Sequence, residues 1–431
     1  MADPDVHSAY RRAGVDYAVL DAGKRDALSE ALATSHWLAD AGPDAGAQAL
    51  DASRGEPAFV LRFAGSTLAF VLETLGTKSV LAREYEKTLF EIGAIARIGD
   101  AGHFADVAYD TVAAVLNDLI CVGALPLVLN AYFATGSSEW YAHGERAQAL
   151  LAGWRRACDD ARCAWGGGES PALTGLIQRE DIELAGSALG FVPPPGEPLL
   201  GERLAPGDEI VLVASSGLHA NGASLARRVA SELPEGLLTP LSDPAAPPGD
   251  RRSGEAPGRP FGEAPGSRFG EAPGSRFATQ PAGERFGETV LRPSVLYVEL
   301  VRRLLAEPGL QLSYLSHITG HGLLKLMRPR RELTYRVGTL PPVPPVLAFL
   351  AERAGLDAPA AYSTLNMGAG FAVYCRPGQG ARVVALAAEL GLDALVAGAV
   401  EQGPRRVILE PVGVEFASDQ LALGPAAEPA G

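Results

Sequence analysis

Apolar and polar residues alternate along the first half of the chain in two different periods. An Ala-, Asp- and Gly-rich stretch over residues 1–50 predicts an N-terminal extension with one or two helices. Short apolar runs then predict strands at 57–63, 67–72, 126–133 and 182–192. Helical spacing of apolar residues covers 110–123, and an Ala/Arg-rich helix is expected at 145–163. Together these elements predict a mixed α/β domain over residues 51–195 that ends at a Pro/Gly turn.

The second half repeats this pattern and predicts another α/β domain over residues 196–420. Strands are expected at 209–214, 370–375 and 394–400. Helices are expected at 221–233, 293–305 and 344–354. The fold class is therefore α/β in two domains, with mixed sheets packed against helices in each half.

A Pro/Gly-rich segment over residues 244–286 interrupts the second domain. It contains an eight-residue tandem repeat, Phe261–Arg268 followed by Phe269–Arg276. Such a composition cannot bury a core, so we expect a disordered insertion and, at 421–431, a disordered tail. Partner binding by the repeated Phe residues is the alternative interpretation.

Composition restricts the function. The 431 residues carry a formal net charge of -14, which argues against a nucleic-acid partner because phosphate backbones need a basic surface. No apolar run reaches the length of about 20 residues that a membrane span needs, so no membrane association is expected. The four cysteines form no CxxC pair or zinc spacing, which predicts idle thiols in a reducing cytoplasm.

Two polar groups in the first domain are candidates for phosphate and metal chemistry. Gly76, Thr77 and Lys78 follow an apolar strand and offer a backbone N–H, a hydroxyl and an ammonium to a phosphate, or form an ordinary turn. Asp110 and Asn117 lie seven residues apart in an apolar stretch, so they share a helix face and could point at one cleft. Their oxygens suit magnesium, and internal hydrogen bonding is the alternative.

Glycine-rich and His-containing segments supply further candidates. A flexible turn at 166–170 carries Gly168 and Glu169, and glycine permits close approach to a ligand. Two strand-to-helix junctions, at 215–222 and 317–322, present hydroxyls, imidazoles and N–H groups of the kind that bind anions. Their candidate residues are Ser215, Ser216, His219, Asn221, His317, Thr319 and Gly320. No third ligand at zinc spacing accompanies the histidines.

Taken in order, these segments resemble the aminoimidazole ribonucleotide synthetase (phosphoribosylformylglycinamidine cyclo-ligase, PurM-like) family. The family pattern runs TDGVGTK, NDL, GGET, SSG-x-H-S-N-G, HITGGGL and FNMG-x-G. The matching segments here are 73–78, 117–119, 167–170, 215–222, 317–323 and 365–370, the last with Asn366. The segment 13–23 is similar to the family's N-terminal AGVDIDAG, and 131–136 to its YYATG.

The resemblance implies an ATP- and magnesium-dependent ligase of purine biosynthesis, with a homodimer formed through the N-terminal sheets. Formylglycinamidine ribonucleotide and ATP would give aminoimidazole ribonucleotide, ADP and phosphate. Glu73, Asp110 and Glu169 would bind magnesium, and Lys78, His219 and His317 would be catalytic. The remaining candidates would bind ATP or substrate: Gly76, Thr77, Asn117, Gly168, Ser215, Ser216, Asn221, Thr319, Gly320 and Asn366.

The sequence also departs from the family pattern. Glu73 and Thr74 replace Asp and Gly, and His321 replaces the third Gly of HITGGG. These differences indicate a divergent branch. Two alternatives follow: another ATP-using enzyme of the same fold, such as thiamine monophosphate kinase or selenophosphate synthetase, and a non-catalytic regulatory paralogue that binds nucleotide.

Overall fold

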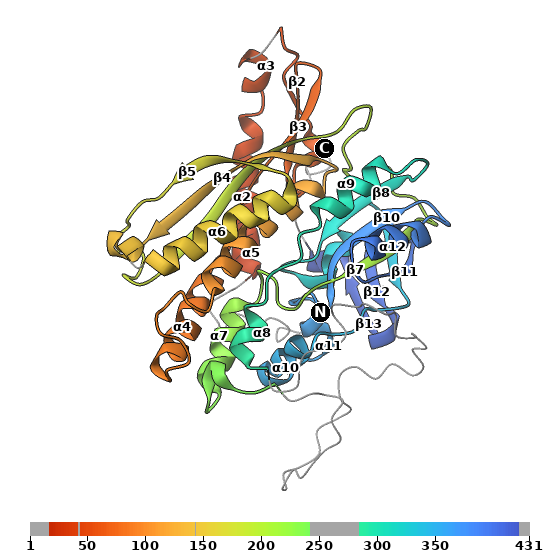
Figure 1. Cartoon of the computed structure of the whole chain (residues 1–431). Coiled ribbons are helices and arrows are strands. Elements are labelled where there is room, and N and C mark those ends of the chain that lie inside the picture. The colour runs from red at the N-terminus through yellow and green to blue at the C-terminus, as the bar shows by residue number, and fades with distance from the viewer. Residues whose placement is uncertain (1–16, 42–43, 143, 242–283, 422–431) are drawn as a thin grey trace.

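The chain folds around two β-sheets, one from each half (Figure 1). The computed structural model describes residues 17–41, 44–142, 144–241 and 284–421. The repeats, the tail from 422 and the AGVD segment at 13–16 lie outside the described residues. Among the helices that are described, none is both long and apolar enough to cross a bilayer.

The first sheet has six strands in the order β1-β2-β3-β6-β4-β5. Its strands are β1 Gln48–Ala49, β2 Phe59–Phe63, β3 Ser66–Thr74, β4 Leu125–Thr135, β5 Ala164–Glu169 and β6 Ile182–Phe191. Neighbouring strands are antiparallel except for the parallel pair β4–β5. Alternation along β3 buries Ala69 and Val71, while Phe70 and Leu72 remain 47% and 63% exposed on the opposite face.

Three helices cover the buried face of this sheet: α4 Lys78–Glu91, α5 His103–Ile120 and α6 Gly144–Ala161. The helix α5 packs on β3 and β6, and α6 packs on α5 (Figure 1). Most of α5 is apolar and buried, yet Asp110, Asn117 and Asp118 are buried with it. Three buried polar side chains on one helix require internal partners, and they point to the site.

The second sheet has seven strands in the order β13-β12-β9-β11-β7-β10-β8. Its strands are β7 Glu209–Ala214, β8 Leu312–His317, β9 Leu333–Val337, β10 Ala369–Cys375, β11 Ala394–Gln402, β12 Arg406–Leu409 and β13 Val414–Ala417. The helices around it are α7 Ala223–Glu232, α8 Phe286–Val290, α9 Val298–Ala306, α10 Pro345–Ala354, α11 Ala358–Tyr362 and α12 Gly380–Glu389. Every residue of β10 is buried, as expected for a central strand.

The N-terminal extension contributes α2 Tyr17–Ala33 and α3 Trp37–Ala41. No side chain described over residues 19–33 is fully buried, so α2 lies on the surface of the folded body. Its sequence lacks a continuous apolar stripe, and Val19 and Leu20 are exposed. The attachment of α2 therefore depends on polar contacts.

Three local expectations differ from the structure. The helix expected at 293–305 begins only at Val298, because side chains of α5 and of the 215–222 junction bind the backbone of 293–297 outside the helix. The turn expected at 166–170 is mostly strand β5, where a side chain at Gly168 would place a Cβ 1.9 Å from the Ala131 carbonyl oxygen. At 284–286, expected inside the insertion, the folded chain has already resumed, and Phe286 is fully buried at the start of α8.

Candidate active site between the two domains

A cavity of about 440 Å³ opens where the two halves of the chain meet. The end of β3, the last turn of α5 and the loop after β8 form its walls, and α2 forms a further wall. Its polar lining includes Asp21, Lys24, Arg25, Glu73, Asp118, Asn221, His317, Thr319, His321, Lys325 and Arg328. These polar residues come from five separate parts of the sequence and meet at one cavity.

Two carboxylates, Glu73 and Asp118, stand beside each other in this cavity. Burial and then the charge of Asp118 raise the pKa of Glu73 from 4.5 to about 7. Burial also disfavours ionised Asp118, but the hydrogen bond and charge of His317 outweigh it and lower the pKa of Asp118 to about 2. Of the two carboxylates, Glu73 is therefore the one that is more readily protonated.

Asp118 orients His317. The Nδ1 atom of His317 lies 2.6 Å from Oδ1 of Asp118, which joins the end of α5 to the end of β8. Because a carboxylate only accepts, Nδ1 carries the proton and Nε2 is left as an acceptor. Lys325 lies close enough to affect both carboxylates, and its ammonium donates to the Thr319 hydroxyl.

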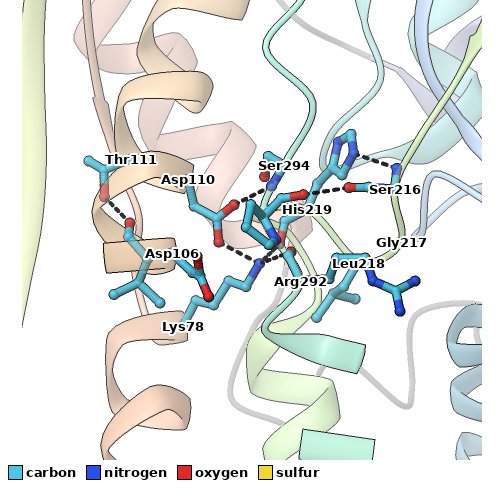
Figure 2. Close-up of polar contacts among 12 residues, drawn as sticks. Lys78, Asp106, Asp110, Thr111, Ser216, Gly217, Leu218, His219, Arg292 and Ser294 are labelled. Carbon is cyan, nitrogen blue, oxygen red and sulfur yellow. Dashed lines mark hydrogen bonds and ion pairs between the residues drawn. The ribbon is translucent and has the colours of Figure 1, made fainter. Parts of the chain in front are cut away.

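A second polar cluster is buried inside the protein (Figure 2). The Lys78 ammonium and the Asp110 carboxylate are 2.5 Å apart, and both side chains are fully buried. The ammonium also donates to the His219 carbonyl at 2.8 Å, and Asp110 accepts from the Ser294 N–H at 2.6 Å. Since α4 and α5 supply the ion pair, it fixes both second-domain segments to the first domain.

His219 accepts two backbone hydrogen bonds in this cluster. Its Nε2 lies 3.0 Å from the Ser216 nitrogen and 3.4 Å from that of Val295. Burial, assisted by the charges of His317 and Lys78, holds the pKa of His219 well below its usual range. The ring is therefore a neutral acceptor. The His219 backbone is in the left-handed region, with φ of 60°.

Four more predicted site residues make structural hydrogen bonds near this cluster. Asn117 receives the Tyr297 N–H and donates to the Val295 carbonyl, each at 2.9 Å. The Ser216 hydroxyl donates to the Pro293 carbonyl, and Ser215 donates to Asn366. Asn366 in turn donates to the Gly217 carbonyl at 2.8 Å. Asp110 and Asn117 share a helix face as predicted, but that face holds residues 294–297 instead of opening on a cleft.

The predicted residues thus separate into two groups. The cavity is lined by Glu73, Asn221, His317, Thr319 and Gly320. The interior or the strand ends hold Gly76, Thr77, Lys78, Asp110, Asn117, Gly168, Glu169, Ser215, Ser216, His219 and Asn366. The structure does not gather the three expected magnesium ligands: Asp110 pairs with Lys78, and Glu169 is exposed on β5. Within the described ranges, no group of three or more His, Cys, Asp or Glu side chains is placed to hold a metal ion.

Several cavity residues carry no role predicted from the sequence, among them Asp118, Lys325 and the α2 residues Asp21 and Lys24. Asp118 could have been found, since it follows Asn117 in the NDL motif and is a buried acid on an apolar helix. Lys325 follows the 317–322 junction within a single helical turn. Asp21 lies in the segment that is similar to the family's AGVDIDAG, but no local pattern indicated its contact with His321, which is 300 positions away.

Comparison with known proteins agrees with this architecture. Residues 55–192 match the family model described as "AIR synthase related protein, N-terminal domain". The HypE–HypF complex contains a chain of similar fold, with a TM-score of 0.51 and 16% identity over 84% of this chain and 93% of that one. Thiamine-monophosphate kinase from Stenotrophomonas maltophilia K279a is similar at a TM-score of 0.50 and 19% identity, covering 82% and 90%.

Proteins of similar sequence indicate the family to which the chain belongs. Phosphoribosylformylglycinamidine cyclo-ligase from Methanothermobacter thermautotrophicus is 33% identical over 63% of this chain and 67% of its own length. The enzyme of the same name from Sorangium cellulosum is 33% identical, covering 73% and 72%. Fold and cavity thus define a two-domain protein of the AIR synthase related class. Within that class, the chain belongs to the phosphoribosylformylglycinamidine cyclo-ligase family.

Proposed function

We propose that this protein converts formylglycinamidine ribonucleotide and ATP to aminoimidazole ribonucleotide, ADP and phosphate, a step of purine biosynthesis. The observation that carries the proposal is the cavity between the domains, where paired carboxylates face an oriented histidine and two cationic residues. The family relationship supplies the substrate.

The reaction divides into two steps. The amide oxygen of the substrate, a poor leaving group, takes the γ-phosphoryl group of ATP and becomes an iminophosphate. The amine nitrogen of the same molecule then attacks that carbon, the C–O bond breaks, phosphate leaves and a proton is lost. A cavity that holds both ends of the substrate together accelerates ring closure by proximity.

His317 is the side chain best placed to move the proton. Its Nδ1–H is committed to Asp118, so its Nε2 can accept from the attacking amine. Lys325, Thr319 and Asn221 lie around it and can hold phosphate or ribose oxygens. Phosphoryl transfer depends mainly on such positioning and charge neutralisation.

The carboxylate pair fits a magnesium ion. Burial, and then the charge of Asp118, raises the pKa of Glu73 to about 7, and a cation between the two carboxylates would favour their ionised forms. Magnesium is usually held by one or two carboxylates together with substrate phosphates, so two protein ligands suffice. When bound, the ion would neutralise phosphate charge.

The buried cluster has a positioning role in this proposal. Lys78, Asp110 and Asn117 fix residues 292–297 and the 215–222 junction to the first domain, and His219 links that junction to Val295. They do so while fully or almost fully buried. These contacts hold the two walls of the cavity in a fixed position relative to each other.

A homodimer through the first sheet is also proposed. The face of this sheet opposite its helices carries Phe59, Leu61, Leu68, Phe70, Leu72, Leu189 and Phe191 in cross-strand register. Exposed fractions of 47% for Phe70 and 63% for Leu72 support coverage by a second copy of this chain. A cytoplasmic location agrees with four buried cysteines that form no disulfide.

Turnover of formylglycinamidine ribonucleotide with ATP and magnesium tests the function, with the aminoimidazole product detected by diazo coupling. We expect product with the wild-type chain and at least a hundredfold lower kcat/KM for Asp118→Asn, because His317 loses its oriented tautomer. Glu91→Gln, an exposed acid on α4, is the control and should match wild type. Bound ATP without product would instead favour a sister enzyme or a regulatory paralogue.

A further inference from the structure

The wall of the cavity formed by α2 presents one face of a helix. Asp21, Lys24, Arg25 and Leu28 all line the cavity. Their spacing of three and four residues places them on one side of α2. Because α2 buries no described side chain completely, this face is its principal contact with the site.

A polar contact joins α2 to the loop after β8 in the second domain. The Nε2 atom of His321 lies 2.9 Å from Oδ2 of Asp21, with the two side chains only 9% and 13% exposed. A carboxylate only accepts, so the ring nitrogen donates. The contact joins the first described helix to the loop after β8 across 300 positions of the sequence.

His321 occupies a backbone conformation that favours glycine, with φ of 70°. A non-glycine residue in this region is held there at a cost of about 1 kcal/mol or more. The imidazole makes the hydrogen bond to Asp21, and a glycine at this position could not. The contact is therefore present despite the strained backbone of His321.

Lys24 follows Asp21 by one turn and faces the carboxylates. Its charge acts on both Asp21 and Glu73, and its side chain lines the same cavity. Lys325 and Arg328 line this cavity as well. A phosphate group between these cations would be neutralised from two sides, and a lysine ammonium is a common point-charge binder of phosphate.

We propose that α2 belongs to the ligand site: Lys24 binds a phosphate group of the bound ligand, and Asp21 and His321 are positioning residues that hold α2 over the cavity. The inference rests on the proposed function for the identity of that ligand. The phosphate can come from ATP or from the ribonucleotide substrate, and the chemistry of recognition is the same.

Calorimetric titration of the full chain with two probes, ATP and ribose 5-phosphate, tests this inference and separates the two sources. Loss of one charged hydrogen bond predicts that Lys24→Gln weakens binding of at least one probe by about tenfold or more. In turnover, the same variant should raise the KM of the corresponding substrate with little change in kcat. Lys87→Gln, an exposed lysine on α4, is the matched control.

The positioning residues have their own signature. His321→Gly should weaken the same probe while the midpoint of thermal unfolding stays level or rises, since the strained backbone is relieved. His321→Asn, which keeps a donor and tolerates the left-handed conformation, should restore part of the affinity. Asp21→Ala removes the acceptor and should weaken the same probe as His321→Gly without relieving the strained backbone, whereas Asp26→Ala on the exposed side of α2 should match wild type.

Two results would overturn the inference. One is a Lys24→Gln protein that binds both probes and turns over like Lys87→Gln, while the wild type is active; the proposed function would then stand without it. The other is wild-type protein that binds neither probe. Ring closure measured separately decides the proposed function in either case.

Discussion

The buried pair of Lys78 and Asp110 allows a quantitative test of the structure. Lys78→Met removes the ammonium while keeping an unbranched apolar side chain of similar length. The Asp110 carboxylate is then left inside the protein with the Ser294 N–H as its remaining partner among the contacts described. The His219 and Arg292 carbonyls lose their donor at the same time.

Breaking a buried pair from one side costs about 3–5 kcal/mol, because one charge remains buried without compensation. The exposed pair of Lys87 and Glu91 is the internal comparison. Its atoms are 3.8 Å apart and both side chains are 60% exposed, so its removal should cost about 0–1 kcal/mol. The two lysines lie on the same helix, α4, which matches their local surroundings.

Urea unfolding followed by circular dichroism gives both values. A double-mutant cycle of Lys78→Met, Asp110→Asn and the combined variant isolates the pair, and we expect the combined loss to be at least about 2 kcal/mol smaller than the sum of the single losses. Single variants that unfold within about 1 kcal/mol of wild type, like Lys87→Met, would refute the assignment of a buried ion pair.

This test also changes how an activity experiment is interpreted. Asp110→Ala would abolish turnover whether Asp110 binds magnesium or holds the two domains together. Only the unfolding measurement distinguishes these roles, because a metal ligand in an open cavity is usually dispensable for folding. Because Asp110 is paired with Lys78 inside the protein, Asp110→Ala is expected to lower the free energy of unfolding as well as turnover.

Three further outcomes are expected. Burial and a neighbouring carboxylate raise the pKa of Glu73 from 4.5 to about 7. The native state therefore binds this proton more tightly than the unfolded chain does. As the pH rises from 4.5 to 8, metal-free wild type should lose about 3 kcal/mol more unfolding free energy than Glu73→Gln. Equal urea midpoints of the two proteins across that range would contradict the raised pKa of Glu73. Leu72→Lys should convert a dimer to a monomer in light scattering, and an unchanged mass would place the dimer contact elsewhere. His219→Phe leaves the Ser216 and Val295 N–H groups without their acceptor, so it should cost about 2–4 kcal/mol and speed amide exchange at both; unchanged exchange would remove the acceptor role.

The sequence by itself determines much of the secondary structure of this protein. Alternation along residues 67–72 and helical spacing over 110–123 predict elements that the structure contains as β3 and α5. The common face of Asp110 and Asn117 also follows from helical geometry alone. Ordered motifs indicated the family for the same reason: each is a short segment whose chemistry depends on neighbours in sequence.

Only the tertiary structure decided what each polar face meets. The helix face with Asp110 and Asn117 binds the backbone of residues 294–297, which lie about 180 positions later in the sequence. The adjacent Asp118 points to the cavity instead. A rotation of about 100° around α5 separates these two destinations. Periodicity fixes that rotation but not the packing of the domains, which selects the partner. The contact of Asp21 with His321 joins surfaces that only domain packing brings together, so no pattern within either segment could predict it.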